Sequence, residues 1–281
     1  MHGDRFESGI HGPPPECGTP NIIVKFQLLP STFEENGTAS PRQHLTCFVV
    51  VDRVAFDAGS LAMSASPLQR LQVRDVVLTH AHLDHIAGLP LFIDDLFAVL
   101  SQPICIHATA EVIEVLERDV FNWSVYPKFS ELSNKNGAVI EYRQFFAGSR
   151  FRVGHLDVQA LNVNHKVPTT GFVIANENAT IAFTGDTAEM DGFWQSVNEL
   201  EDLSAILVEC AFPDELEELA NISHHLTPTR LKTELKKCAQ ANTPIYAINL
   251  KPMYYEEIAR QLGSLGIPNL EILSVGKVYE W

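Results

Sequence analysis

The feature that most constrains this chain is one short segment, His80-Ala81-His82-Leu83-Asp84-His85. It follows directly on the apolar, β-branched run 75–78, which predicts a short buried strand. Because side chains alternate along a strand, His80 and His82 are expected on the same side, while Asp84 and His85 reach a neighbouring point as the chain turns into a helix. Three imidazoles and a carboxylate form a borderline ligand set that suits zinc, manganese or iron. The segment therefore predicts a metal site rather than a polar loop that happens to contain histidines.

The order of apolar runs along the chain indicates the fold class. Runs rich in β-branched residues predict strands at 22–29, 45–51, 75–78, 104–106, 156–161, 171–174, 180–183, 205–208, 245–248 and 270–272. Apolar residues at helical spacing predict helices at 89–100, 109–123, 190–201, 227–241 and 254–265. Strands come mostly in runs early and alternate with helices later. This order favours an α/β sandwich of two packed sheets with helices outside over a Rossmann arrangement.

Length and composition fit one large domain. The chain has 281 residues, of which 46% are hydrophobic, so it can bury a sizeable core. We expect a flexible segment at residues 1–18, which has three consecutive prolines and lacks the basic start and apolar stretch of a signal peptide, and one folded domain at residues 19–281. No apolar run approaches the roughly 20 residues that span a bilayer. These features predict a cytoplasmic protein without a membrane anchor.

Charge and cysteine usage exclude several classes of function. The formal net charge of −15 argues against broad binding to nucleic acid, because phosphate backbones are held by an excess of Lys and Arg. Five scattered cysteines without a CxxC pair favour reduced thiols over disulfides or a zinc–thiolate site. The chain also lacks GxGxxG and GxxxxGK[ST] segments, so nothing supports a nucleotide-cofactor or NTPase function.

Two further segments offer metal ligands after predicted strands. His165 lies in Asn164-His165-Lys166, just beyond the strand expected at 156–161, and Asp186 lies in Gly185-Asp186-Thr187, just beyond the strand expected at 180–183. Either one alone is more often an ordinary polar residue or a turn. A two-metal site needs ligands from outside residues 80–85, and the order of these residues after that segment makes both of them candidates.

These motifs together resemble the metallo-β-lactamase superfamily. The pattern is His80-x-His82-x-Asp84-His85, then His165, then Asp186, and the turn at 56–59 resembles the early Asp-x-Gly turn of that superfamily. Within it, segments 80–89, 120–129 and 250–252 are most similar to class II cyclic-nucleotide phosphodiesterases. The resemblance covers nearly the whole chain. It implies an αββα sandwich of two mixed sheets that uses two divalent metal ions, zinc by preference, to hydrolyse cAMP or cGMP to the 5′-monophosphate.

The resemblance also implies a role for each candidate residue. It assigns His80, His82 and His165 to the first metal, Asp84 and His85 to the second, and Asp186 to both. Asp57 is expected to hydrogen-bond a ligand and fix the orientation of an imidazole. The last ligand in the family is usually a histidine, and here the matching position is Asn249. Because an amide oxygen is a weaker zinc ligand than imidazole, we expect a two-metal site of reduced affinity, with Asn249 as a weak ligand, a water in its place, or the second site often empty.

A second histidine element supplies a candidate proton donor. His225 and Glu209 match the His and carboxylate of the tRNA 3′-processing hydrolases, in which the His protonates the leaving group. A His paired with a Glu tends to stay protonated, as a general acid requires. With Asp84, they form the expected catalytic set. Two alternatives remain open: His224 and His225 are exposed residues before a helix, or His224 replaces the missing metal ligand.

Other functions and contacts also stay open on the sequence alone. A tRNA 3′-processing-like ribonuclease would share His225 and Glu209, and a metal-binding sensor or pseudoenzyme would explain Asn249. The aromatic segment 120–129 either packs as a loop or stacks a nucleobase. Lys166 and Lys251 are candidate phosphate contacts. Self-association into a homodimer is compatible with the sequence but has no motif of its own.

Overall fold

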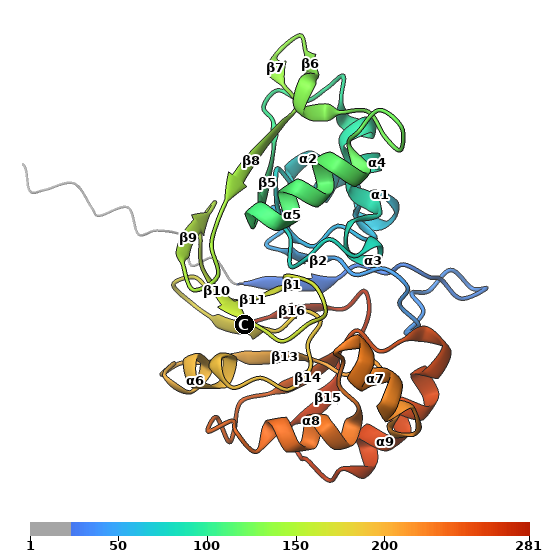
Figure 1. Cartoon of the computed structure of the whole chain (residues 1–281), viewed down its shortest axis with the longest axis vertical. Coiled ribbons are helices and arrows are strands. Elements are labelled where there is room, and N and C mark those ends of the chain that lie inside the picture. The colour runs from blue at the N-terminus through green and yellow to red at the C-terminus, as the bar shows by residue number, and fades with distance from the viewer. Residues whose placement is uncertain (1–23) are drawn as a thin grey trace, which may run out of the picture.

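The computed structural model describes residues 24–281, so the segment expected at residues 1–18 lies outside the described residues. Two β-sheets lie face to face in the middle of the molecule, and helices cover the outer face of each sheet (Figure 1). Both sheets mix parallel and antiparallel neighbours. The predicted sandwich of two packed mixed sheets with helices outside is therefore confirmed.

The first sheet has the strand order β16-β1-β2-β3-β4-β5-β8. Its strands are β1 (Lys25–Leu28), β2 (Phe48–Val50), β3 (Val54–Phe56), β4 (Asp75–Val77), β5 (Ile104–Ala108), β8 (Ile140–Gln144) and β16 (Val278–Glu280). The run from β3 to β8 is parallel, whereas β16, β1, β2 and β3 pair antiparallel. The carboxyl ends of β3 and β4 therefore lie side by side at one edge.

The second sheet has the strand order β15-β14-β13-β12-β11-β10-β9. Its strands are β9 (Arg150–Val153), β10 (Leu156–Asn162), β11 (Thr170–Ala175), β12 (Thr180–Phe183), β13 (Ala205–Glu209), β14 (Ile245–Ile248) and β15 (Leu270–Ile272). The run from β12 to β15 is parallel, and β9 to β12 form an antiparallel meander. A small hairpin of β6 (Ser133–Asn134) and β7 (Gly137–Ala138) stands apart from both sheets.

The helices divide between the two outer faces. Five precede or follow strands of the first sheet: α1 (Leu61–Ser64), α2 (Pro67–Gln72), α3 (Leu83–Ile86), α4 (Gly88–Leu96) and α5 (Ala110–Val115), which continues as the π-helix η1 (Leu116–Val120). Four belong to the second sheet: α6 (Gly192–Asn198), α7 (Glu217–Ser223), α8 (Pro228–Leu235) and α9 (Tyr255–Ser264). Short 3-10 turns lie at η2 (Phe129–Glu131), η3 (Asp214–Leu216) and η4 (Pro252–Tyr254). No helix among the described residues has the length and apolar character that crossing a bilayer demands.

In the described residues, the core consists of three large apolar layers, which follow from strand alternation, and a small cluster around Phe212. Phe48 and Phe56 of the first sheet meet Phe172 and Phe183 of the second in the layer between the sheets. The neighbouring Ala182 belongs instead to the layer under the outer helices, because successive side chains point to opposite faces. Each fully buried large apolar side chain contributes about 1.5–3 kcal/mol. This rigid sandwich fixes the relative positions of the strand ends that carry the site.

Several short elements were not predicted. Strands β3 and β16 have only three residues each, which is too short to stand out in the sequence. Strands β8 and β9 are edge strands with charged residues, so no apolar run marks them. Helices α1, α2 and α7 have four to seven residues, which is too short for a helical period to stand out.

Candidate metal centre

The candidate residues follow the carboxyl ends of strands in both sheets. Parallel neighbours end at the same edge of a sheet, so loops after them meet. The predicted residues follow these strands: Asp57 after β3, His80 after β4, His165 after β10, Asp186 after β12, Glu209 at the end of β13 and Asn249 after β14. Facing sheets therefore bring six loops to one edge of the sandwich.

The turn after β3 is shaped to receive the segment that carries Asp84. Asp57 adopts a left-handed backbone conformation with φ of 58°. Gly59 follows, and a Cβ at that position would lie 2.0 Å from the backbone oxygen of Asp84. That oxygen accepts a hydrogen bond from the amide of Thr46 at 2.8 Å. Glycine is thus required at position 59 because the backbone of the histidine segment packs directly on the turn.

Two groups of side chains in this structure have the geometry of a metal site. The larger one, hereafter the four-residue group, consists of His80, His82, His165 and Asp186. The smaller one, hereafter the three-residue group, consists of Asp84, His85 and Asp186. Within each group the potential ligand atoms all lie within 4.8 Å of one another. Asp186 belongs to both groups, so the two lie next to each other around one shared carboxylate.

Hydrogen bonds to the Nδ1 atoms fix which nitrogen three of the histidines offer. The Asp57 carboxylate accepts from His85 Nδ1 at 2.7 Å and from the Thr79 hydroxyl at 2.9 Å. Since the Thr79 proton is used in this way, its oxygen accepts from His80 Nδ1 at 2.9 Å. Each Nδ1 therefore carries a proton, which leaves Nε2 as the atom that each of these imidazoles can offer to an ion.

His165 is oriented by a backbone carbonyl. Its Nδ1 donates to the oxygen of His224 at 3.0 Å, because a carbonyl can only accept. Its Nε2 then lies 3.3 Å from Nδ1 of His82, so two ring nitrogens converge on one point. The side chain of His224 bonds to Asn164 at 3.0 Å and belongs to neither group. The structure thus places His224 as a support for His165 and not among the ligand atoms.

The electrostatics of the two groups differ. Burial lowers the pKa of His80 and His82, and it lowers the pKa of His165 to about 4. These imidazoles are therefore neutral, which is the form that binds metals. Burial also acts against a charged His85, but the carboxylates of Asp186 and Asp57 outweigh it and raise its pKa. Burial also opposes ionisation of Asp186, but the neighbouring His85 outweighs the effect of burial. The pKa of Asp186 is therefore lowered.

The residues present fit a divalent cation. His80 Nε2 is buried and has no hydrogen-bond partner among the described residues, and it lies 3.9 Å from Oδ2 of Asp186. A buried polar atom without a partner is unfavourable unless something binds it. Neutral imidazole nitrogens converging beside an ionised carboxylate are a donor set typical of zinc and related ions. The fold and this cluster together therefore support divalent-metal binding.

The loop after β14 approaches both carboxylates of the three-residue group. Asn249 has φ of 58°, and its amide nitrogen donates to Asp186 Oδ1 at 2.6 Å, while its oxygen accepts from Thr46 at 3.3 Å. Lys251 Nζ lies 3.2 Å from Asp84 Oδ2. Burial disfavours the charged amine of Lys251, but Asp186 and Asp84 outweigh it and raise its pKa. In this arrangement Asn249 offers a donor to Asp186, and its role as a weak ligand stays a prediction.

A histidine–glutamate pair lies beside the cluster. His225 and Glu209 are both buried, and His225 Nδ1 contacts Oε1 of Glu209. The other oxygen of Glu209 accepts from the amide of Leu226 at 2.8 Å, and Arg230 donates to the carbonyl of His225 at 2.8 Å. The ring of His225 lies 4.9 Å from that of His165, centre to centre. Burial acts against a charged His225, but Glu209 outweighs it and raises its pKa.

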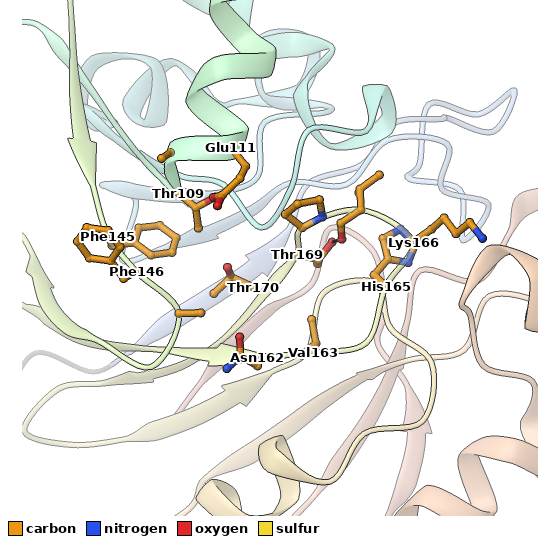
Figure 2. A pocket seen from close by; sticks show the side chains of 14 residues that line it. Thr109, Glu111, Phe145, Phe146, Asn162, Val163, His165, Lys166, Thr169 and Thr170 are labelled. Carbon is orange, nitrogen blue, oxygen red and sulfur yellow. Dashed lines mark hydrogen bonds between the residues drawn. The ribbon is translucent and has the colours of Figure 1, made fainter.

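A pocket of about 460 Å³ opens next to His165. Figure 2 shows Thr109 and Glu111 on one side of it and Asn162 and Thr170 on the other. Phe145 and Phe146 lie at the end away from His165, and Lys166 lies beside that histidine. Pockets that bind small ligands typically measure about 300–1,000 Å³. The volume and the mixture of aromatic and polar side chains suit a small organic molecule that reaches the four-residue group.

The aromatic segment 120–129 does not line this pocket. Phe121 and Phe129 are buried in the layer under the helices of the first sheet, with ring centres 5.5 Å apart. Trp123 is exposed, and its indole nitrogen donates to Glu131 at 3.3 Å. Of the two interpretations of this segment, the structure favours packing.

Sequence reasoning missed three supporting contacts. Thr79 links Asp57 to His80, the carbonyl of His224 holds His165, and Arg230 holds the carbonyl of His225. The position of Thr79 directly before the histidine segment could have suggested its role. A backbone carbonyl has no signature in a sequence, and Arg230 lies on α8, where it resembles any surface arginine.

Comparison with known proteins agrees with this geometry. The model of the beta-lactamase superfamily domain matches residues 52–244. A probable 3′,5′-cyclic-nucleotide phosphodiesterase from Yersinia pestis is 26% identical over 211 residues, which cover 66% of this chain and 60% of that protein. The chain thus spans less than two thirds of that relative.

Solved structures are similar in fold. Unliganded yeast PDE1 has a TM-score of 0.72 at 16% identity, covering 92% of this chain and 99% of that one. Human tRNase Z, short form, has a TM-score of 0.62 at 19% identity, covering 92% and 98%. The match of the family model over most of the chain, together with the two-sheet sandwich, shows that this protein belongs to the beta-lactamase superfamily and has the metallo-β-lactamase fold.

Proposed function

We propose that this protein is a metal-dependent phosphodiesterase that hydrolyses 3′,5′-cyclic nucleotides to 5′-monophosphates. The observation that carries the proposal is the position of the His225–Glu209 pair against the His/Asp cluster. A buried histidine that a glutamate keeps protonated is suited to protonate an alkoxide leaving group. Lactam hydrolysis creates no such alkoxide. The similarity to a protein named as a probable cyclic-nucleotide phosphodiesterase supports the same reaction.

In this proposal the two groups hold two divalent ions, with zinc as the first choice. His80, His82 and His165 would bind one ion, Asp84 and His85 the other, and Asp186 both. When bound, such ions supply a nucleophilic water at neutral pH and neutralise charge on the phosphoryl oxygens. Asp57 and Thr79 hold Nδ1 of His85 and His80, so that each Nε2 would be the atom available to an ion. Asp84 contributes to catalysis by its placement beside the shared carboxylate.

The protein's own proton donor acts at the leaving oxygen. Cleavage of the bond between phosphorus and the 3′ oxygen of a cyclic nucleotide leaves an alkoxide. His225 gives its Nε2 proton to that oxygen, while Glu209 holds Nδ1 and stabilises the cationic ring. The bond from Leu226 to Glu209 and the bond from Arg230 to the His225 carbonyl keep the pair in place.

The pocket beside His165 gives the nucleoside a place to bind. Its Phe146 side chain is 66% exposed and can stack on a base, while Asn162 and Thr170 offer hydrogen bonds. Lys251 is the better placed of the two lysines for a phosphate contact, because it reaches the metal centre. Lys166 is exposed beside His165 and lines the pocket.

Product analysis tests the proposed reaction. Purified protein is loaded with Zn²⁺ or Mn²⁺ and incubated with cAMP and cGMP, and the products are separated by chromatography. We expect 5′-AMP or 5′-GMP, no 3′-monophosphate, and loss of turnover with a chelator. Absence of hydrolysis of both cyclic nucleotides by the metal-loaded protein would refute the proposal, and so would full activity of Asp186→Ala after metal depletion.

A tRNA 3′-processing ribonuclease is the second candidate. The His225–Glu209 pair favours it as well, and a chloroplastic tRNase Z from Arabidopsis thaliana is 26% identical over 136 residues. The net charge of −15 disfavours it, because tRNA binding needs an excess of cations. A competition assay distinguishes the two candidate functions. If tRNA inhibits cGMP hydrolysis only at low salt and is itself cleaved, the result favours the ribonuclease.

A further inference from the structure

The two groups around Asp186 differ in one respect that their ligand atoms alone do not reveal. Both carboxylates of the three-residue group already have a donor from the loop after β14. Lys251 Nζ lies 3.2 Å from Asp84 Oδ2, and Asn249 Nδ2 lies 2.6 Å from Asp186 Oδ1. The loop is anchored, because the amide of Lys251 donates to the oxygen of Ala211 at 3.1 Å and η4 begins directly after it.

In the four-residue group, no lysine or arginine of the described residues forms an ion pair with a ligand atom. Within residues 24–281, the ion pairs of Asp186 involve only His80 and His85 and include no Lys or Arg. His82 and His165 face each other at 3.3 Å, and His80 Nε2 has no partner. An ion can therefore enter this group without displacing a charged side chain.

We propose that Lys251 is an internal cation that competes with the divalent ion for the three-residue group. The ammonium occupies one oxygen of Asp84, which an ion in that group needs, and it repels a second positive charge nearby. The amide of Asn249 holds the shared carboxylate from the same side. The four-residue group then binds its ion tightly, and the three-residue group binds a weaker, exchangeable one.

Metal affinity, measured without turnover, tests this asymmetry. The inference rests on the metal binding assumed in the proposed function but not on which phosphodiester is cleaved. Metal-free full-length protein is titrated with Zn²⁺ by calorimetry, and the ions retained after gel filtration are counted by mass spectrometry. We expect wild-type protein to retain one ion per chain and to bind the second at least about 10-fold more weakly, a difference within the range that ligand environments produce.

Substitutions at Lys251 separate its charge from its packing. Lys251→Met removes the ammonium, and we expect the second ion to bind about 10-fold more tightly while the first is unchanged. Lys251→Arg keeps the charge and should keep the weak second site. Asn249→His adds an imidazole and should also strengthen the second site. Lys166→Met is the matched control, because this lysine lies beside His165 and no ion pair within residues 24–281 joins it to either group, so both affinities should stay as in wild type.

The outcomes distinguish this inference from the proposed function. Two ions held with equal, high affinity by the wild type would overturn the role of Lys251 and leave the phosphodiesterase proposal standing. An unchanged second affinity in Lys251→Met, with a folded protein by circular dichroism, would overturn it as well. Absence of any bound ion in the wild type would overturn both.

Discussion

The four-residue and three-residue groups share Asp186 and lie side by side, but the chain surrounds them differently. The four-residue group draws ligands from both sheets, and burial keeps its imidazoles neutral. The three-residue group draws two of its members from the segment around α3, and its carboxylates contact Lys251 and Asn249. The difference shows that two groups with similar side chains have different surroundings, and we expect the bonds that those side chains already make to change the metal affinity.

The largest effect is expected where the two groups meet. Asp186→Ala removes the carboxylate that both share, so we expect both ions to be lost and cyclic-nucleotide turnover to fall below about one part in 10⁴, because bound metal lowers the pKa of water from 15.7 to about 7. Metal content and initial rates, measured on the same sample, check this. If Asp186→Ala retained one ion at wild-type affinity, Asp186 would not be a ligand shared by both ions.

The next largest effect concerns the proton donor beside the four-residue group. His225→Ala should lower kcat on cAMP or cGMP by roughly 10²–10⁴-fold, the usual range for general acid catalysis. Metal content should stay at the wild-type value, since His225 belongs to neither group. Bis(p-nitrophenyl) phosphate serves as the control substrate, because its leaving group departs without a proton. Equal losses on the two substrates would contradict the role of His225 as an acid.

The orienting hydrogen bonds offer a way to perturb the two groups to different extents, because Asp57 contacts His85 directly and His80 only through Thr79. Asp57→Asn weakens the bond that positions His85, and we expect the affinity for the second ion to fall about 10–100-fold. Thr79→Val removes the partner of His80 Nδ1 and should weaken the first ion instead. Calorimetric titration of both variants reads the two affinities separately. If Asp57→Asn lowered only the affinity for the first ion, our assignment of the Asp57 hydrogen bond to the three-residue group would be wrong.

The smallest expected effect tests on which side the nucleoside binds. Phe146 lies in the pocket that touches His165, and Asp84 and His85 do not line it. Phe146→Ala should raise KM for cyclic nucleotides about fivefold, near the lower end of the stacking range of ~1–3 kcal/mol, and leave kcat unchanged. Met253→Ala, an 84% exposed residue near Lys251, should alter neither constant. If only Met253→Ala raised KM, the nucleoside would bind beside the three-residue group and not in the pocket next to His165.

Much of the fold was predictable from particular residues. The apolar runs before His80 and around 180–183 correspond to β4 and β12, and the alternating apolar residues of 156–161 correspond to β10, because a strand that is buried on one face alternates apolar and polar side chains. The order of the strands within each sheet was not predictable, since pairing depends on contacts between distant residues. The three-residue strand β3, which Asp57 follows, gives no period that a sequence window can detect.

The candidate site was predictable in its residues but not in its asymmetry. Motif order indicated His165 and Asp186, and the structure brings both to the histidine segment. Asn249, at the position where the family usually has a histidine, indicated that the second metal site differs from that of the family. The contact of Lys251 with Asp84 depends on how the loop after β14 folds back over the edge of the sandwich, and no local pattern encodes that approach.

One titration tests whether two unequally bound ions at this centre support the hydrolysis of cyclic nucleotides. Metal-free protein receives Zn²⁺ in steps, and bound ion and cGMP hydrolysis are measured at each step. We predict no turnover without metal, one tightly bound ion first, and activity that rises as the weaker ion binds. Full turnover in the metal-free protein, or no hydrolysis when both groups are occupied, would contradict the account.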